Sequence, residues 1–289
     1  MPLLLNGADW LYDPDAHDTP MRVACLMSGS GANVEKVIEH QYKTYRETRL
    51  DRLPYRVVAI FTDNRNSRAW HIARKFDVAY ECEDIGDFYN SIGQTDKRDL
   101  TKRPDYFSRV VRKLEQYKPE LYVLGGFMSV VTEPLLSMYR GVNVHPADLA
   151  ITENGRRKYT GDNAVLNQIL AGEKTLRSST HIVRKKVDYG EILMVSQGVN
   201  VDIERAFEEL EAEGSLGVNI NSVTLNYLRK PQHRETAKKI AARHQNWLKE
   251  VGDWVVLPET VDNISRGRVI LENGIARFGG IPEPNGYRL

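Results

Sequence analysis

Short apolar runs alternate with amphipathic stretches through the first half of the chain. The apolar runs predict strands over residues 22–27, 56–62, 78–81, 121–124 and 142–144. The stretches between them predict helices over residues 34–45, 67–76 and 106–117, and from Thr132 onward with Pro134 in the first turn. This alternation predicts an α/β fold with a doubly wound, mostly parallel sheet that is covered by helices.

The second half of the chain mixes helical and extended patterns. Strands are predicted over residues 178–183 and 191–195, joined by a tight turn around Asp188 and Gly190, and helices over residues 162–171, 203–212 and 234–250. Asp162 is the expected cap of the first of these helices. Residues 84–104 are polar and are predicted to form a long surface loop or an insertion.

The tail of the chain is predicted to form a small β module. Asn273-Gly274 favours a type I′ turn, so residues 268–278 are expected to form a hairpin. The apolar run Trp254–Leu257 is expected to add a third strand, because a two-stranded hairpin is marginal alone. We therefore divide the chain into an N-terminal extension at 1–20, a main α/β domain at 21–212, and a C-terminal helical segment with the β module at 213–289.

Composition and charge exclude several classes of protein. Forty basic residues against thirty-nine acidic ones leave a net charge of +1, which argues against a general nucleic-acid binder. No apolar run is long enough to span a membrane, and residues 1–20 hold four acidic and no basic residues, unlike a secretory signal. Cys25 and Cys82 are too few for a disulfide framework, and Cys25 is expected to be buried. These features are typical of a cytoplasmic protein without a metal site, because the histidines and cysteines show no metal-ligand spacing.

A glycine-rich turn links the first predicted strand to the first helix. Gly29, Ser30, Gly31, Ala32 and Asn33 offer backbone N–H groups and a helix N-terminus, which predicts a phosphate site. We expect a side chain at Gly31 to block the close approach of a ligand to the backbone.

Two other interpretations of the glycine turn remain open. A dinucleotide site is one, with Asp63 at the end of the second strand as a ribose carboxylate, although Val34 stands where the fingerprint has its third glycine. A plain turn without a ligand is the other.

The pattern Asn143-x-His145 places an amide and an imidazole on one face of a strand, because side chains alternate along strands. Asp188, from a later turn, could complete an acyl-transfer site, and His181 could support it. The alternative is that His145 is a buried structural residue and Asp188 an ordinary turn residue. The basic run 156–158 is either a solvated loop or a contact for an anionic substrate.

Several separated motifs resemble the folate-dependent formyltransferase family, most of all phosphoribosylglycinamide formyltransferases. They are Ser28–Val34, Tyr117–Leu121 with Leu124–Met128, Asn143–Pro146, Gly161, Thr180-His181 and Val187–Gly190. The resemblance implies that Asn143, His145 and Asp188 are catalytic and that the glycine turn holds the phosphate of the acceptor nucleotide. It also implies a cleft for 10-formyltetrahydrofolate lined by Phe127, Met128, Ser129 and Val130 and by the loop carrying Val187 and Asp188.

The chain departs from the family pattern in two places that bear on the acceptor. Residues 145–150 read His-Pro-Ala-Asp-Leu-Ala instead of His-Pro-Ser-Leu-Leu-Pro, and no segment after Asn200 matches the family's C-terminal helix that helps to hold the ribose phosphate. The expected function is formyl transfer from 10-formyltetrahydrofolate to a phosphorylated amine, with glycinamide ribonucleotide as the first candidate. The alternatives are a hydrolase of the same donor, a transferase for another amine, and a non-catalytic folate or nucleotide sensor. The expected partners are small molecules rather than nucleic acid or membrane, and a homo-oligomer is compatible with the sequence.

Overall fold

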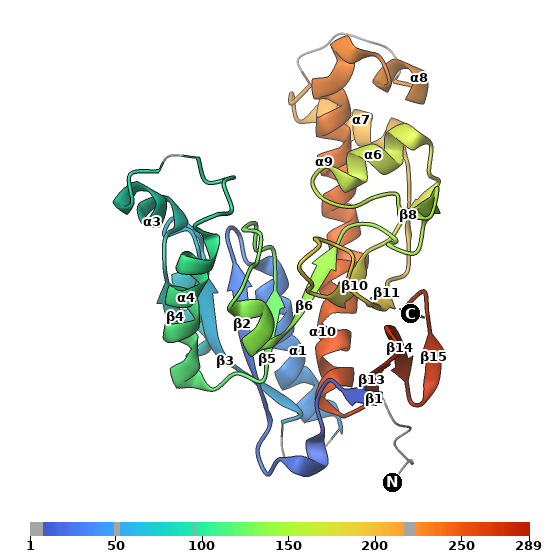
Figure 1. Ribbon diagram of the computed structural model, residues 1–289. Helices are drawn as coiled ribbons and strands as arrows, with labels where there is room; N and C mark the ends of the chain where they lie inside the picture. Colours follow the sequence, from blue (N-terminus) through green and yellow to red (C-terminus); the bar gives the residue numbers. More distant parts are fainter. Residues whose placement is uncertain (1–7, 49–52, 95, 217–222) are drawn as a thin grey trace.

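An eight-stranded sheet crosses the molecule, in the order β16-β11-β10-β6-β5-β2-β3-β4 (Figure 1). The computed structural model describes residues 8–48, 53–94, 96–216 and 223–289. The strands are β2 (Met21–Met27), β3 (Tyr55–Thr62), β4 (Ala79–Cys82), β5 (Leu121–Leu124), β6 (Arg140–His145), β10 (Ser179–Ile182), β11 (Ile192–Val195) and β16 (Tyr287–Arg288). β2 to β6 are parallel, and β10 pairs antiparallel with both β6 and β11. The predicted α/β class with a mostly parallel sheet is confirmed.

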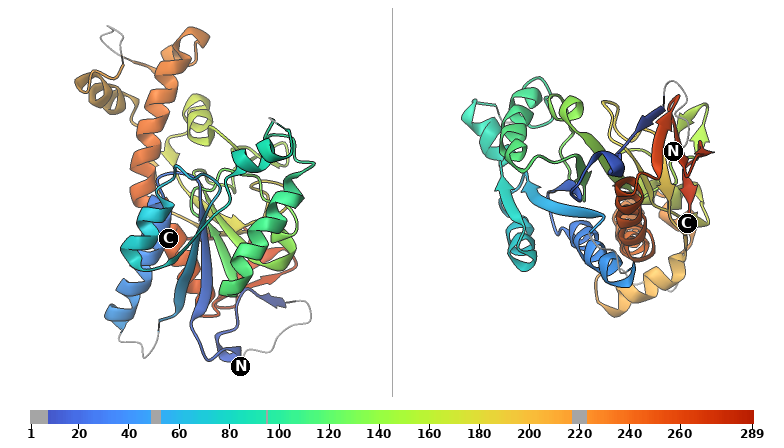
Figure 2. Two further views of the ribbon diagram at one scale, coloured as in Figure 1. Left: turned by 90° about the vertical axis from the view of Figure 1, so that its left-hand side faces the viewer. Right: turned by 90° about the horizontal axis from the view of Figure 1, so that it is seen from below.

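Helices cover both faces of this sheet (Figure 2). Along β2, Val23, Cys25 and Met27 are buried on one face, against α1 (Ala32–Thr48), α2 (Ala69–Phe76) and α10 (Asp253–Ser265). Ala24 and Leu26 are buried on the opposite face, against α4 (Arg103–Leu114), because strand side chains alternate. Cys25 is therefore a small core residue, as the sequence indicated, and burial raises the pKa of its thiol to about 12.

The apolar run Trp254–Leu257 is helical, so the expected third strand of the β module is wrong. It begins α10, whose buried residues are spaced as a helix requires: Val256, Leu257, Thr260, Val261 and Ile264. A run of four apolar residues fits a strand or a buried helix equally well. The helical period shows only when the window extends to Ile264.

The Asn273-Gly274 hairpin is confirmed. β13 (Val269–Glu272) pairs with β14 (Ile275–Phe278), and Asn273 (φ 51°) and Gly274 (φ 76°) both have the positive φ of a type I′ turn. The other strands of this small sheet are β1 (Ala8–Trp10), beside β13, and β15 (Ile281–Glu283), beside β14. The first described strand of the chain thus pairs with a strand of its C-terminal part.

The last strand also contacts the loop that follows β6. β16 pairs in parallel with β11, and Arg288 Nη2 lies 3.0 Å from Asp148 Oδ2, three residues after His145. The two-stranded pairs β7 (Thr152–Glu153) with β8 (Arg156–Arg157), and β9 (Thr175–Leu176) with β12 (Val199–Asn200), lie in the connections nearby.

A helical extension forms a further apolar cluster beyond the sheet. It consists of α6 (Ala164–Ala171), α7 (Ile203–Ala212), α8 (Leu225–Leu228) and the long α9 (Arg234–Val251), which rises away from the sheet (Figures 1 and 2). The remaining elements are α3 (Ile85–Ser91), α5 (Leu135–Met138) and the short 3₁₀ turns at Pro14–Ala16, Glu115–Tyr117 and Pro231–His233. No helix in the described part of the chain is long and apolar enough to cross a membrane.

Two local expectations are corrected. Residues 84–104 contain α3, which begins because the Asp84 side chain accepts hydrogen bonds from the backbone N–H groups of Gly86 and Asp87. Buried Phe88 and Tyr89 fix α3 to the core, so this segment is more than a surface loop. The residue before α6 is Asn163 in a left-handed conformation, rather than Asp162 as the cap.

We expect Leu257→Ala to lower the free energy of unfolding by about 2–5 kcal/mol, because it leaves a cavity in the core beneath α10. Val255→Ala on the same helix is the control; Val255 is 42% exposed, so its loss should change stability by less than about 0.5 kcal/mol. Urea unfolding of both variants measures this. Equal effects of the two substitutions would contradict the packing of α10 on the sheet.

Candidate functional site

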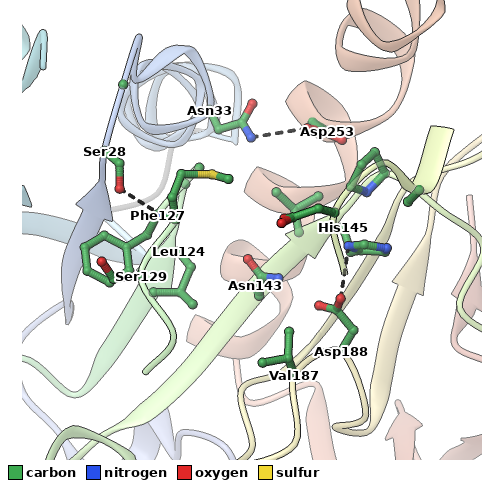
Figure 3. Close-up of a pocket in the computed structure, with 18 of the residues that line it drawn as sticks. Ser28, Asn33, Leu124, Phe127, Ser129, Asn143, His145, Val187, Asp188 and Asp253 are labelled. Atoms are coloured by element: carbon green, nitrogen blue, oxygen red, sulfur yellow. Dashed lines mark hydrogen bonds and ion pairs between the residues drawn. The ribbon is translucent and has the colours of Figure 1, made fainter. Parts of the chain in front are cut away.

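A cleft of about 740 Å³ opens at the carboxyl ends of β2, β5 and β6, where parallel sheets bind ligands (Figure 3). Its walls are the glycine turn, the segment after β5, the end of β6, the loop before β11, and the junction of α9 and α10. The predicted catalytic, phosphate-binding and folate-binding residues all line it: Gly29, Ser30, Gly31, Ala32, Asn33, Phe127, Met128, Ser129, Val130, Asn143, His145, Val187 and Asp188. Asp63 and the basic run 156–158 do not. The structure therefore brings the predicted phosphate, folate and catalytic positions into one cavity.

Asn143, His145 and Asp188 converge at one end of the cleft, together with His181. Asp188 Oδ2 lies 3.4 Å from His145 Nδ1, and Asp188 Oδ1 lies 3.3 Å from His181 Nε2. His181 stands opposite Asn143 in the sheet register, and its Nε2 lies 3.2 Å from Asn143 Nδ2. His181 Nε2 therefore donates to the Asp188 carboxylate, and the Asn143 amide nitrogen lies against the same ring nitrogen.

The imidazole of His145 is buried between two oxygen atoms. Its Nε2 lies 2.7 Å from the carbonyl oxygen of Tyr159, and its Nδ1 faces Asp188. Only the charged imidazolium can donate to both oxygens. Burial nevertheless lowers the pKa of His145 below its usual value, against the opposing influence of Asp188 and the Tyr159 carbonyl. Asp188 does favour the charged imidazole, but desolvation outweighs this influence, so the imidazolium is a readier proton donor.

Asp188 stays ionised although it is buried. Burial alone would raise its pKa, but the hydrogen bond from His181, the charge of His145 and the backbone N–H of Gly161 together lower the pKa to about 2. The Gly161 nitrogen lies 2.7 Å from Asp188 Oδ2. Asp188 has a positive φ of 58°, a conformation that a non-glycine residue holds when its surroundings fix it.

The segment from Arg157 to Gly161 helps to hold Asp188 in this conformation, a role that the sequence did not predict. Arg157, at the end of β8, donates hydrogen bonds to the carbonyl oxygens of Asp188 and Gly190. Tyr159 and Gly161 provide the carbonyl and N–H described above. Arg157 is thus neither a solvated loop residue nor, in this arrangement, a free contact for an anion. The only clue in the sequence was its place between two site motifs.

The glycine turn meets the cleft at the N-terminus of α1. A side chain at Gly29 would meet no atom within 4 Å, so its backbone is open to the cleft. Gly31 has a φ of 71°, and a Cβ there would collide with Ile72 and Met27 in the core. The expectation that a side chain at Gly31 would obstruct the ligand is therefore wrong, because it would disturb core packing instead.

The junction of α9 and α10 adds polar groups that the sequence did not predict. Asp253 accepts hydrogen bonds from Asn33 Nδ2 (3.2 Å) and from Ser178 Oγ (2.6 Å), and burial raises the pKa of its carboxyl group. Gln245 and Lys249 line the cleft beside it. The junction is distant in sequence from the glycine turn, so only the fold places Lys249 near a candidate phosphate site.

Exposed apolar side chains line the wall beside the catalytic cluster. Met128 is 72% exposed and Val187 48% exposed, although both border the cleft. Phe127 is mostly buried and packs against Phe61 and Phe107. Apolar side chains held open in this way offer surface to an apolar part of a ligand. Within the described ranges, no cluster of histidine, cysteine and acidic residues has the arrangement of a metal site.

We expect Asp188→Asn to remove a stabilising charge whose effect depends on pH. The pKa of Asp188 is lowered from 3.8 to about 2, so its contribution is present above about pH 4 and disappears as the pH falls towards 2. Near neutral pH the loss should be about 2 kcal/mol of unfolding free energy, shrinking to zero at low pH. Urea unfolding across this range tests it, with Asp162→Asn, an exposed carboxylate of the same cleft, as the control. A constant difference between Asp188→Asn and the unchanged protein at all pH values would contradict it.

Comparison with known proteins gives the site its context. Residues 21–215 match the family model described as formyl transferase. Phosphoribosylglycinamide formyltransferase of Escherichia coli K12 is 23% identical over 176 residues, which are 60% of this chain and 71% of that protein. The trifunctional purine biosynthetic protein adenosine-3 of Drosophila melanogaster is 27% identical over 175 residues, only 11% of its length.

Solved structures share the fold. Phosphoribosylglycinamide formyltransferase of Coxiella burnetii superposes with a TM-score of 0.63 at 19% identity, over 93% of this chain and 99% of that one. A formyltetrahydrofolate deformylase of Pseudomonas putida KT2440 superposes with a TM-score of 0.57 at 15% identity, over 91% of this chain and 71% of that one. Because the family model spans more than half of the chain, this protein belongs to the formyl transferase family of enzymes that depend on 10-formyltetrahydrofolate.

Proposed function

We propose that this protein transfers the formyl group of 10-formyltetrahydrofolate to the amine of a phosphorylated acceptor, with glycinamide ribonucleotide as the first acceptor to test. The observation that carries the proposal is the shape of the cleft. The Asn143–His145–Asp188 cluster lies at one end, and the glycine turn at the N-terminus of α1 lies at the other. A molecule with an amine and a phosphate would span the two.

The catalytic cluster suits attack of an amine on a formyl carbon. Negative charge develops on the formyl oxygen, and the Asn143 amide and an N–H group of His145 are the donors that would stabilise it. Asp188 is ionised, so it orients the imidazole and can take up a proton from the attacking amine directly or through a water. The bond between the formyl carbon and the folate nitrogen then breaks, and the lowered pKa of His145 lets the imidazolium give its proton to that departing nitrogen.

The remaining walls suit the two substrates. Met128 and Val187 offer apolar surface to the pterin, close to Asp188. Backbone N–H groups of the glycine turn and the Lys249 ammonium would hold the acceptor phosphate. Asp253 accepts from Asn33 at this end and has the chemistry to bind a hydroxyl group of the acceptor.

Hydrolysis of the same donor is the second candidate, because formyltetrahydrofolate deformylases share the fold. The open glycine turn beside Lys249 favours the transferase, since a water nucleophile needs no phosphate site. The deciding experiment follows loss of the formyl group from 10-formyltetrahydrofolate with and without glycinamide ribonucleotide. Formyl transfer that requires the ribonucleotide supports the proposal. Equal release of formate without it indicates a hydrolase, and binding of both compounds without turnover indicates a sensor.

We expect His145→Ala and Asn143→Ala each to lower kcat on the order of a hundredfold to a thousandfold, the usual effect of losing one oxyanion donor. The Kd for the folate should stay within about threefold, because the apolar wall is unchanged. Single-turnover kinetics and equilibrium binding measure the two effects separately. Turnover per folded molecule that remains unchanged would assign His145 a structural role.

Arg157→Gln should lower kcat by about tenfold to a hundredfold, because a small displacement of Asp188 misaligns His145. Arg156→Gln is the matched control: Arg156 is the exposed neighbour on β8, and its loss removes the same charge. If both variants lose activity equally, net charge matters rather than the hold on the Asp188 loop.

A further inference from the structure

The carbonyl oxygen that accepts from His145 Nε2 belongs to an irregular segment. Tyr159 lies between β8 and α6, outside any helix or strand, and its carbonyl oxygen is 2.7 Å from the ring nitrogen. Backbone outside regular structure keeps its position only where other contacts hold it. The contacts of the Tyr159 side chain therefore bear on the catalytic imidazole.

The ring of Tyr159 ends in a hydrogen bond to the C-terminal end of α6. Tyr159 is 2% exposed and packs against Ala147 and Ala164, and its hydroxyl group donates to Glu173 Oε1 at 2.5 Å. Glu173 is held in turn, because its backbone N–H donates to the carbonyl oxygen of Gln168 in α6. Burial raises the pKa of Tyr159 to about 12, so the phenol keeps its proton and remains the donor.

The same helix also contacts the residue that follows His145. The Gln168 side chain is buried, and its Nε2 donates to the carbonyl oxygen of Pro146 at 2.9 Å. Through Gln168 the helix holds the strand end that carries the imidazole, and through Glu173 it holds the carbonyl that the imidazole meets. Tyr159, Gln168 and Glu173 do not line the cleft, so they can affect the reaction only through other residues.

The two ring nitrogens of His145 are held unequally. Nε2 is 2.7 Å from the Tyr159 carbonyl oxygen, whereas Nδ1 is 3.4 Å from Asp188 Oδ2, beyond the about 2.7–3.2 Å of an ordinary N–H···O bond. A carbonyl oxygen can only accept, so Nε2 carries a proton in both the neutral and the charged imidazole. The proton that His145 gains and loses is then the one on Nδ1.

We propose that Tyr159 and Glu173 are positioning residues: their hydrogen bond holds the Tyr159 carbonyl oxygen against His145, which fixes one proton on Nε2 and leaves the Nδ1 proton for transfer. In that transfer the bond between the formyl carbon and the folate nitrogen breaks, and its electron pair stays on the nitrogen. The nitrogen takes the proton from Nδ1, and the imidazole becomes neutral. The use of the Nδ1 proton rests on the proposed function, whereas the hold on Nε2 does not.

Nuclear magnetic resonance of the whole chain with isotope-labelled histidine tests the hold without any substrate. Comparison with His145→Ala assigns the resonances of His145. In the unchanged protein the neutral imidazole should show the Nε2–H tautomer alone. Tyr159→Phe removes only the hydroxyl group that donates to Glu173, so the carbonyl is released and both tautomers should appear.

The same variant should also change the titration of His145 and the reaction. The Tyr159 carbonyl favours the charged imidazole, so its displacement should make His145 titrate at lower pH. The other titratable groups that act on His145 are Asp188, His181 and Asp253, which the substitution leaves in place. We expect kcat for formyl transfer to fall by about tenfold, because the imidazole is less well aligned, while KM for the folate stays within about twofold.

Variants of Glu173 test whether the hydrogen bond itself is responsible. Glu173→Gln keeps an oxygen that can accept from the hydroxyl group, so it should retain the single tautomer and most of kcat. Glu173→Ala should match Tyr159→Phe, and the double variant should be no worse than either one, because all three remove the same bond. If Tyr159→Phe does not fold, Glu173→Ala tests the bond from its other side.

Tyr117→Phe is the matched control. The Tyr117 hydroxyl group also donates to a glutamate, Glu81, at 2.8 Å, and neither residue lines the cleft, so its loss should leave His145 unchanged. A single Nε2–H tautomer that persists in Tyr159→Phe, unchanged kcat in that variant, or equal effects of Tyr117→Phe would overturn the inference. Expected tautomers in a protein that transfers no formyl group would instead overturn the proposed function and support the hold on His145.

Discussion

The buried carboxylate of Asp188 is the group on which the arrangement of the cleft depends. It meets two imidazoles and one backbone N–H group, and these contacts come from three different parts of the chain. Desolvation opposes its charge, yet the pKa is lowered to about 2 because all three neighbours favour the ionised form. One ion in a dry environment therefore ties β6, β10 and the segment after β8 into a fixed constellation.

The same dry environment acts differently on the histidine beside it. A carboxylate with several donors keeps its charge, whereas His145, between one carboxylate and one carbonyl, is pushed towards neutrality by burial. Asp188 therefore keeps its negative charge, whereas protonated His145 readily loses its proton. Chemistry at a carbonyl needs both, since the proton must be present while the oxyanion forms and must leave afterwards.

The sequence was sufficient for the parallel half of the fold and for the main landmarks of the cleft. Those landmarks lie at or just after the carboxyl ends of parallel strands, which meet at one edge of the sheet, so Asn143 and the glycine turn border the same edge. It was insufficient where distant segments are brought in by packing. Asp253 and Lys249 reach the cleft only because α10 packs on the sheet, and the four apolar residues that open α10 also fit a strand. In the sequence, Arg157 looks like any solvent-exposed cation. The burial that lowers the pKa of His145 arises only in the folded chain.

The contact between β16 and the loop after His145 joins residues that are synthesised at very different times. Asp148 leaves the ribosome long before Arg288, its partner in the ion pair, and Asn33 leaves long before Asp253. A nascent chain that has emerged only as far as α7 already contains Asn143, His145 and Asp188. It still lacks Asp253 and Arg288, the partners of Asn33 and Asp148. The cleft therefore lacks Lys249 and Asp253 until α9 and α10 have emerged, so a shorter nascent chain would bind its ligands poorly.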